Sequence, residues 1–305
     1  MTHSRLDSID ALRGGALLAM VVYHAAWDLS MFGLTEVDVA NDPLWTLLAR
    51  ATTCAFLALV GVSLVLARQS PRPGRVLRRF AITAAAAGAV SLGSWYFQPE
   101  AFIYFGILHC IALSGLLGLV FLRAPGWVVA AAAAFCLAAP WLLANPFFDR
   151  PWWLWLGLST EVPVSADHVP ILPWFGVVLL GVLAGREVLR RAREPFWQAR
   201  GVATRLLAGA GRWTLLIYLL HQPLLLGGLT LLVPTPLPGS PAEKFEASCR
   251  AAGQPEAICR AYAACIVEGL APDPGIAAAA EQGRMTPAQA TLWRESVARC
   301  RAAAP

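Results

Sequence analysis

Seven apolar stretches run through the sequence and restrict its fold more than any other feature. A helix needs about 20 largely apolar residues to cross a bilayer, and most of these stretches approach that length. The tryptophan-rich segment Pro151–Leu158 is too short to span and is typical of an interfacial or re-entrant turn. The sequence therefore predicts an all-α polytopic bundle of about seven transmembrane helices, at Leu12–Ser30, Leu44–Ala67, Phe80–Phe97, Phe102–Leu122, Trp127–Ala144, Ile171–Gly185 and Trp213–Val233.

Composition and charge place the chain in a membrane. Charged residues make up 14% of the 305 residues and hydrophobic residues 57%, whereas soluble domains carry about 25% charge. The net charge of +5 does not indicate a nucleic-acid partner, because arginines gather in two short loops, Arg68–Arg79 and Arg186–Arg212. The loops on the other side contain only Arg150. We therefore expect a multi-pass membrane protein with a cytoplasmic N-terminus and an extracytoplasmic C-terminal tail.

The chain after residue 233 is of another kind. We divide the sequence into a membrane domain (residues 1–233), a proline-rich linker (234–241) and a small tail (242–305). Capping boxes at Ser240–Glu243 and Thr286–Gln289, together with Pro255, mark helix starts in the tail. The tail is therefore predicted to be a bundle of two to four short helices.

Cysteine positions agree with this division. Three cysteines fall in predicted spans, where they are typical small apolar residues, and the remaining four fall in the tail. An even number in a short extracytoplasmic segment indicates two disulfides with three possible connectivities. A helical hairpin turning at residues 252–254 would place Cys249 opposite Cys259 and leave Cys265 with Cys300. A zinc site is the rival interpretation, but the tail has no CxxC pair and no histidine, so we expect no metal.

Three histidines lie inside predicted spans: His24, His109 and His221. At about 1.5 Å per helical residue, they fall within one layer about 7 Å thick near the centre of the bilayer. An imidazole there needs a partner or a cavity. The simpler explanation is that each ring bonds a neighbouring helix. Three rings at one depth favour a shared chamber.

Further polar residues accompany these histidines. Asp28 follows His24 by one turn on the same helix face and can orient its imidazole, while Arg50 can pair with Asp28 or extend to the interface. At the inner mouth of the first span, Asp10 and Arg13 are three residues apart and can form a local ion pair.

The last span carries a second polar group of residues. Tyr218 shares a helix face with both His221 and Gln222, and Pro223 removes a backbone hydrogen bond and favours a kink. Kinks with polar residues at mid-depth are typical of cavity linings.

Four blocks of the sequence stand out: Ser8-Ile-Asp10-x-x-Arg13-Gly14 with His24, Phe105-Gly-Ile-Leu-His109, Leu172-Pro-Trp174-Phe-Gly176 and Leu216-Ile-Tyr218-Leu-Leu-His221-Gln222-Pro223. Together they resemble transmembrane acyltransferases, and specifically bacterial proteins related to heparan-alpha-glucosaminide N-acetyltransferase. The resemblance implies a bacterial inner membrane with the C-terminal tail in the periplasm. The resemblance covers about Arg5 to Val233 and leaves the tail unmatched. The lysosomal enzyme of that name is much longer, so its glucosaminide acceptor is not carried over.

The resemblance implies transfer of an acyl group, expected to be acetyl, from cytoplasmic acyl-CoA to an extracytoplasmic sugar or glycan. Acyl transfer needs a base, an oxyanion donor and a dry site. We expect these catalytic roles at His24, Asp28, His109, Tyr218 and His221. Candidates for binding CoA are Asp10, Arg13, Arg78, Arg79 and Arg212, and candidates for binding the acceptor are Arg50, Asp167, Trp174 and Gln222.

Two other functions stay open at this point. A polar layer at mid-depth also fits a transporter or channel, although the two halves of the sequence show no internal repeat. A non-catalytic membrane subunit that uses the disulfide-linked tail as a binding module is the other alternative. Formation of a homo-oligomer is left open.

Overall fold

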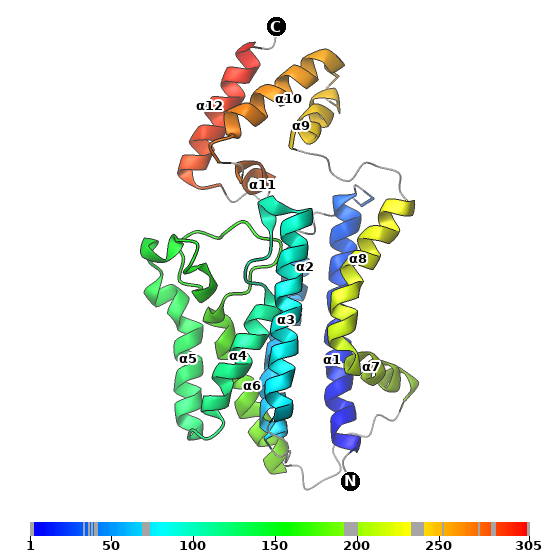
Figure 1. Ribbon diagram of the computed structural model, residues 1–305, viewed down its shortest axis with the longest axis vertical. Helices are drawn as coiled ribbons and strands as arrows, with labels where there is room; N and C mark the ends of the chain where they lie inside the picture. The colour runs from blue at the N-terminus through cyan, green and yellow to red at the C-terminus, as the bar shows by residue number, and fades with distance from the viewer. Residues whose placement is uncertain are drawn as a thin grey trace. The chain divides into compact units, whose positions relative to one another are not determined.

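The structure is a computed structural model that describes residues 3–32, 34, 35, 37, 39, 42–68, 74–191, 201–232, 241–251, 253–273, 275–281 and 285–303. All regular secondary structure in these ranges is helical (Figure 1). The chain divides into two compact units, residues 1–26 with 42–224 and residues 27–41 with 225–305. The predicted linker at 234–241 lies outside the described residues, apart from Pro241.

Six described helices are long and apolar enough to cross a bilayer, which confirms a multi-pass membrane protein. A further apolar helix, α4, has 15 residues and is shorter than the others. The apolar helices are α1 (His3–Met31), α2 (Pro43–Ala67), α3 (Gly74–Phe97), α4 (Ile107–Phe121), α5 (Gly126–Leu143), α6 (Ile171–Arg191) and α8 (Thr214–Leu232).

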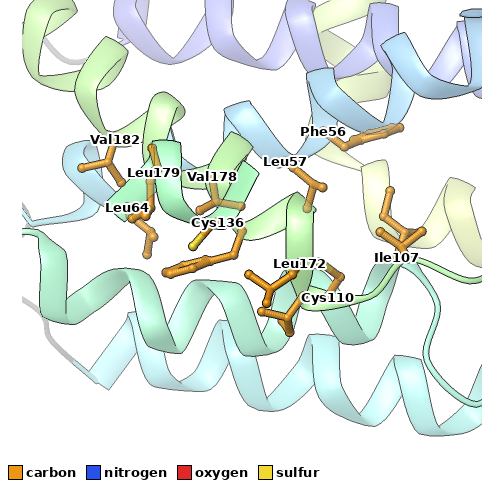
Figure 2. Close-up of a cluster of buried hydrophobic side chains, with 14 of the residues drawn as sticks. Phe56, Leu57, Leu64, Ile107, Cys110, Cys136, Leu172, Val178, Leu179 and Val182 are labelled. Carbon is orange, nitrogen blue, oxygen red and sulfur yellow. The ribbon is translucent and has the colours of Figure 1, made fainter. Parts of the chain in front are cut away.

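Helix α6 is the centre of the first unit, where it contacts α2, α4 and α5. Val178, Leu179 and Val182 of α6 are fully buried. They pack in one cluster with side chains of α2 and with Cys136 of α5 (Figure 2). Gly61 of α2 allows the two backbones to approach closely, because a Cβ there would overlap the carbonyl oxygen of Val178. Close backbone contact through a small residue is the typical means of packing helices in membranes.

Helix α4 begins at Ile107, five residues later than the predicted start at Phe102. The residues before it are not helical, and they pair with the segment that leads into α6. The backbone N–H of Ala166 donates to Ala101 O at 2.8 Å, and that of Val169 donates to Phe105 O at 3.1 Å. These bonds provide the hydrogen-bond partners that a helix would otherwise supply, so the backbone before Ile107 can stay extended. The predicted fourth span therefore starts too early.

The region between α6 and α8 also differs from the prediction. The expected loop Arg186–Arg212 contains the end of α6 and a separate helix, α7 (Val202–Arg212). Helix α7 buries Ala208 and exposes Val202 and Leu206, so it is amphipathic and suited to the membrane surface. The sequence predicts a loop at this helix because the segment is rich in arginine.

Short 3₁₀ helices complete the first unit. They are η1 (Pro99–Ala101), η2 (Pro146–Asp149) and η3 (Leu154–Leu156). The predicted re-entrant or interfacial segment, residues 151–158, consists of turns and η3. A single 3₁₀ turn is far too short to cross a bilayer.

The described part of the tail is helical, as predicted. Its helices are α9 (Pro241–Ala251), α10 (Glu256–Leu270), α11 (Ile276–Glu281) and α12 (Pro287–Ala303). The capping box at α12 is confirmed: Thr286 N donates to Gln289 Oε1 at 3.0 Å, and Gln289 N donates to Thr286 Oγ1 at 3.2 Å.

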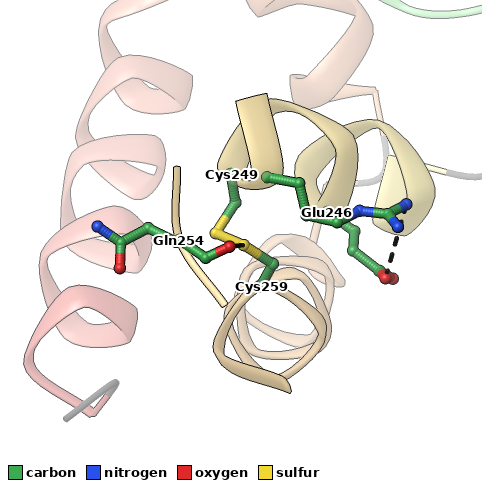
Figure 3. The surroundings of a disulfide bond; sticks show 5 residues. Glu246, Cys249, Gln254 and Cys259 are labelled. Atoms are coloured by element: carbon green, nitrogen blue, oxygen red, sulfur yellow. Dashed lines mark hydrogen bonds and ion pairs between the residues drawn. A yellow bond between two sulfur atoms is a disulfide. The ribbon is translucent and has the colours of Figure 1, made fainter. Parts of the chain in front are cut away.

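Both predicted disulfides are present. Cys249 bonds Cys259, with Cα atoms 5.4 Å apart, beside the Glu246–Arg250 ion pair of α9 (Figure 3). Cys265 bonds Cys300, with Cα atoms 5.7 Å apart, and so links α10 to α12 around buried Ile266 and Ile276. Disulfides compensate for the small core of a segment this short.

The contact between α2 and α6 gives a test of the fold. Gly61→Ala should lower the stability by about 1–3 kcal/mol, because the new methyl group meets backbone atoms that cannot move separately. The matched control is Gly88→Ala on α3, where a Cβ meets nothing within 4 Å and stability should not fall. Thermal unfolding of both variants in one detergent measures the difference. Equal melting temperatures would contradict the tight packing of α2 on α6.

Candidate active site

The first unit contains a cavity of about 450 Å³ whose lining combines charge with an apolar wall. Its charged residues come from the first turns of α1 and α3 and from the end of α7, and they are Asp10, Arg13, Arg79 and Arg212. The apolar wall includes Phe56 of α2, Ile107 and Leu108 at the start of α4, and Leu215 of α8. Tyr218 of α8 also lines this cavity, which we call the arginine cavity.

Ion pairs fix two of the three arginines in this lining. Arg13 donates to Asp10 Oδ1 at 2.7 Å and to Ser63 Oγ at 2.6 Å, so it connects α1 with α2. Arg212 donates to Asp7 Oδ1 at 2.6 Å and lies 3.9 Å from Asp10 Oδ2. Ser63 is a partner that the sequence prediction missed, although it is a hydroxyl in an otherwise apolar run.

Arg79 differs from the other two arginines of the cavity. Its side chain is exposed on α3 and forms no ion pair with any described residue. Its guanidinium therefore keeps all its donors available for a ligand. The neighbouring Arg78 is also exposed but does not line the cavity.

Two of the three predicted histidines meet beside Tyr218. The ring centroids of His24 and His221 are 5.0 Å apart, and those of Tyr218 and His221 are 5.6 Å apart. His24 is half-buried on α1 and His221 is buried on α8. The first and last apolar helices of the domain thus bring two imidazoles together next to a residue of the cavity wall.

A backbone carbonyl fixes the tautomer of His221. Its Nδ1 lies 2.6 Å from the carbonyl oxygen of Tyr218, which can only accept, so Nδ1 carries the proton and donates. In the neutral ring Nε2 then presents a lone pair. This atom is buried and has no hydrogen-bond partner among the described residues. A buried lone pair without a partner is the form that a general base requires.

His109 is placed elsewhere, at the start of α4. The backbone N–H of Gly106 donates to its Nδ1 at 3.2 Å, and its Nε2 lies 3.3 Å from Ser91 Oγ on α3. Its ring thus caps α4 and links α4 to α3. The structure does not bring this ring into contact with the His24–His221 pair.

Asp167 holds the same helix start from the opposite segment. Its Oδ2 accepts from the backbone N–H of Ile107 at 2.8 Å, and a Cβ at Gly106 would overlap this oxygen. Burial raises the pKa of the Asp167 carboxyl to about 6, although the Ile107 hydrogen bond acts in the opposite direction.

A pair that sequence reasoning missed lies beside Asp167. Tyr104 Oη and His168 Nδ1 are 2.9 Å apart, and they join the segment before α4 to the segment before α6. Burial lowers the pKa of the His168 imidazole to about 4 and raises the pKa of the Tyr104 hydroxyl, so both are neutral at pH 7. The sequence feature that could have indicated this pair is the Asp-His dipeptide directly before the Val-Pro-Ile-Leu-Pro block.

The remaining predicted residues are dispersed. Asp28 is fully buried on α1 one turn after His24, and Gln222 is half-buried next to His221. Trp174 packs against the core, and Arg50 is exposed on α2; neither lines the arginine cavity. Within the described ranges no three metal-ligating side chains gather.

A sequence model of one protein family covers this site. The family is described as heparan-alpha-glucosaminide N-acetyltransferase, catalytic, and its model matches residues 5–223. The matched range includes the arginine cavity and the His24–His221 pair, and it ends before the tail. No curated protein and no solved structure matches the chain.

Asp167 gives the site a testable pH dependence. Its folded pKa of about 6 lies above the ordinary 3.8, so the folded chain keeps a proton that the unfolded chain has released. Stability should therefore fall as the pH rises from 4 to 6, by about 2 kcal/mol, and then stay level. Asp167→Asn keeps an acceptor for Ile107 and should remove this slope. Parallel curves of melting temperature against pH for the two proteins would contradict the raised pKa.

Proposed function

Since the chain belongs to the heparan-alpha-glucosaminide N-acetyltransferase catalytic family, we propose that it transfers an acetyl group from acetyl-CoA to a sugar or glycan. The acceptor presents a hydroxyl or an amine on the far side of the membrane. The observation that carries this proposal is the His24–His221 pair, which lies against Tyr218 in the wall of the arginine cavity.

The arginine cavity suits the donor. Three guanidiniums line it, and Arg79 is not engaged by any described acid, so phosphates of CoA find charge-assisted donors there. The volume of about 450 Å³ lies within the range of about 300–1000 Å³ usual for small-molecule sites. The apolar part of the lining, which includes Phe56, Ile107 and Leu215, fits the pantetheine arm of CoA.

The imidazole pair supplies the proton chemistry. Nε2 of His221 takes the proton of the acceptor hydroxyl or amine as that atom forms a bond to the acetyl carbonyl carbon. The bond between this carbon and the CoA sulfur then breaks, and the sulfur leaves as the thiol with the proton that His221 returns. His24 lies beside this proton path, and Tyr218 can donate to the carbonyl oxygen as it becomes negative.

The positive-inside rule supports a direction for this transfer. By that rule the arginine-rich loops lie in the cytoplasm together with the N-terminal ends of α1 and α3, so in this proposal the donor enters there. The acceptor then approaches from the opposite face of an inner membrane, on the side to which the disulfide-linked tail belongs.

Removing the base gives the first test of this function. His221→Ala should reduce acetyl transfer from labelled acetyl-CoA by about 10²–10⁴-fold at unchanged donor affinity, because the acceptor proton loses its base. His24→Ala should also reduce the rate. The control is His168→Gln, which removes a half-buried imidazole that does not line the cavity and should keep most activity. Full transfer by His221→Ala, in protein with normal thermal stability, would exclude His221 from the mechanism.

Adjacent arginines on α3 test the donor site. Arg79→Gln should raise the KM for acetyl-CoA about tenfold, because a charge-assisted phosphate contact contributes more than an ordinary hydrogen bond. Arg78→Gln removes the same charge one residue away, outside the cavity lining, and should raise the KM less. Steady-state kinetics with varied acetyl-CoA measures both values. An equal change in the two variants would show that only the general charge of the loop matters.

A further inference from the structure

A second hollow lies at the ends of α2, α4 and α6, and no residue of the arginine cavity lines it. Its volume is about 510 Å³, and three arginines reach it: Arg68, Arg123 and Arg186. The rest of its lining is apolar and comes from Val65, Leu122, Ala124 and Leu189. None of the described residues in its lining is acidic. It therefore combines concentrated positive charge with a hydrocarbon wall.

The end of α4 fixes two of these arginines. Arg68 Nη1 donates to Leu122 O at 2.6 Å, and Arg186 Nη2 donates to Phe121 O at 2.7 Å. These are carbonyls at the end of α4 that lack intrahelical partners. Each guanidinium has five N–H donors, so one such bond orients the group and leaves further donors available. Two arginines from different helices are thus held in place beside one another.

Arg123, unlike the other two arginines, does not bond a carbonyl at the end of α4. Its side chain is exposed and forms no ion pair with any described residue, although it lines the same hollow as the two fixed arginines. Glu187, which follows Arg186 in α6, forms an ion pair with Arg190 at 2.7 Å. Three like charges without a lining carboxylate repel one another, and an anion between them relieves that repulsion.

We propose that this hollow binds the phosphate of an anionic phospholipid, with Arg68, Arg123 and Arg186 as its ligands. The hollow lies where the apolar spans α2 and α6 end, which is the depth of lipid head groups. Basic pockets between transmembrane helices bind such head groups, and the apolar wall accommodates the start of an acyl chain. This site is independent of the acetyl-transfer function.

Lipid binding to the whole purified protein in neutral detergent tests this proposal. Phosphatidylglycerol should bind with higher affinity than phosphatidylcholine, and the affinity should fall as salt is added. Arg123→Gln should lower the affinity for phosphatidylglycerol about fivefold, because one arginine near an anionic head group is lost. This variant breaks no hydrogen bond within the described structure. Arg123→Glu should lower the affinity further.

The matched control is Arg205→Gln on α7, which removes an exposed arginine away from the hollow and should leave lipid affinity unchanged. Equal losses at Arg205 and Arg123 would overturn the site, because general charge would then explain the binding. Unchanged affinity in both Arg123 variants would also overturn it. Displacement of the lipid by millimolar inorganic phosphate or by CoA would assign the hollow to a soluble phosphate and overturn the lipid assignment.

Discussion

Backbone polar groups inside a bundle of apolar helices must find partners within the protein, and this requirement shapes the centre of the membrane unit. Two segments meet this requirement by bonding each other: residues 101–106, which lead from the end of η1 to α4, and the non-helical residues 165–170. Asp167 accepts from the first N–H of α4, and the ring of His109 accepts from Gly106. Without these bonds, the late start of α4 would leave unpaired donors among apolar side chains.

The same arrangement positions the candidate site. Because α4 starts late, Ile107 and Leu108 at its beginning become part of the cavity wall, together with Tyr218. The tight contact of α2 with α6 through Gly61 gives this wall a rigid support. At the other side Gly211 of α7 lies so close to the backbone of Asp10 that a Cβ would overlap it, which places Arg212 next to the first turns of α1. Close packing thus brings the arginines together.

Local signals in the sequence were sufficient for much of the fold. Apolar length located the spans, the Thr286–Gln289 capping box located α12, and cysteine spacing gave Cys249–Cys259 and Cys265–Cys300. These features depend on residues near one another in the chain or on composition. The break before Ile107 was missed because the residues there are as apolar as the helix that follows, and its cause lies 60 residues away at Asp167.

The candidate site shows the same limit. Depth along each span correctly placed His24 and His221 near a common level, and their rings meet. Depth alone could not show that His109 lies apart from this pair, because the direction of its side chain depends on the rotation of α4 about its axis. The tautomer of His221 and the partnership of Arg13 with Ser63 are likewise matters of three-dimensional contact. Apolar patterning and residue spacing in the sequence do not reveal such contacts.

The shortness of α4 has a consequence for the barrier that the protein presents. Fifteen residues rise about 22 Å, whereas the hydrocarbon core of a bilayer is about 30 Å thick. The low-dielectric layer is therefore about a quarter thinner at α4 than the surrounding lipid, and hydrogen-bonded polar backbone occupies the difference. The work of bringing a polar group toward the interior decreases with that thickness, so the chain lowers the solvation barrier at the start of α4, where Ile107 and Leu108 line the arginine cavity.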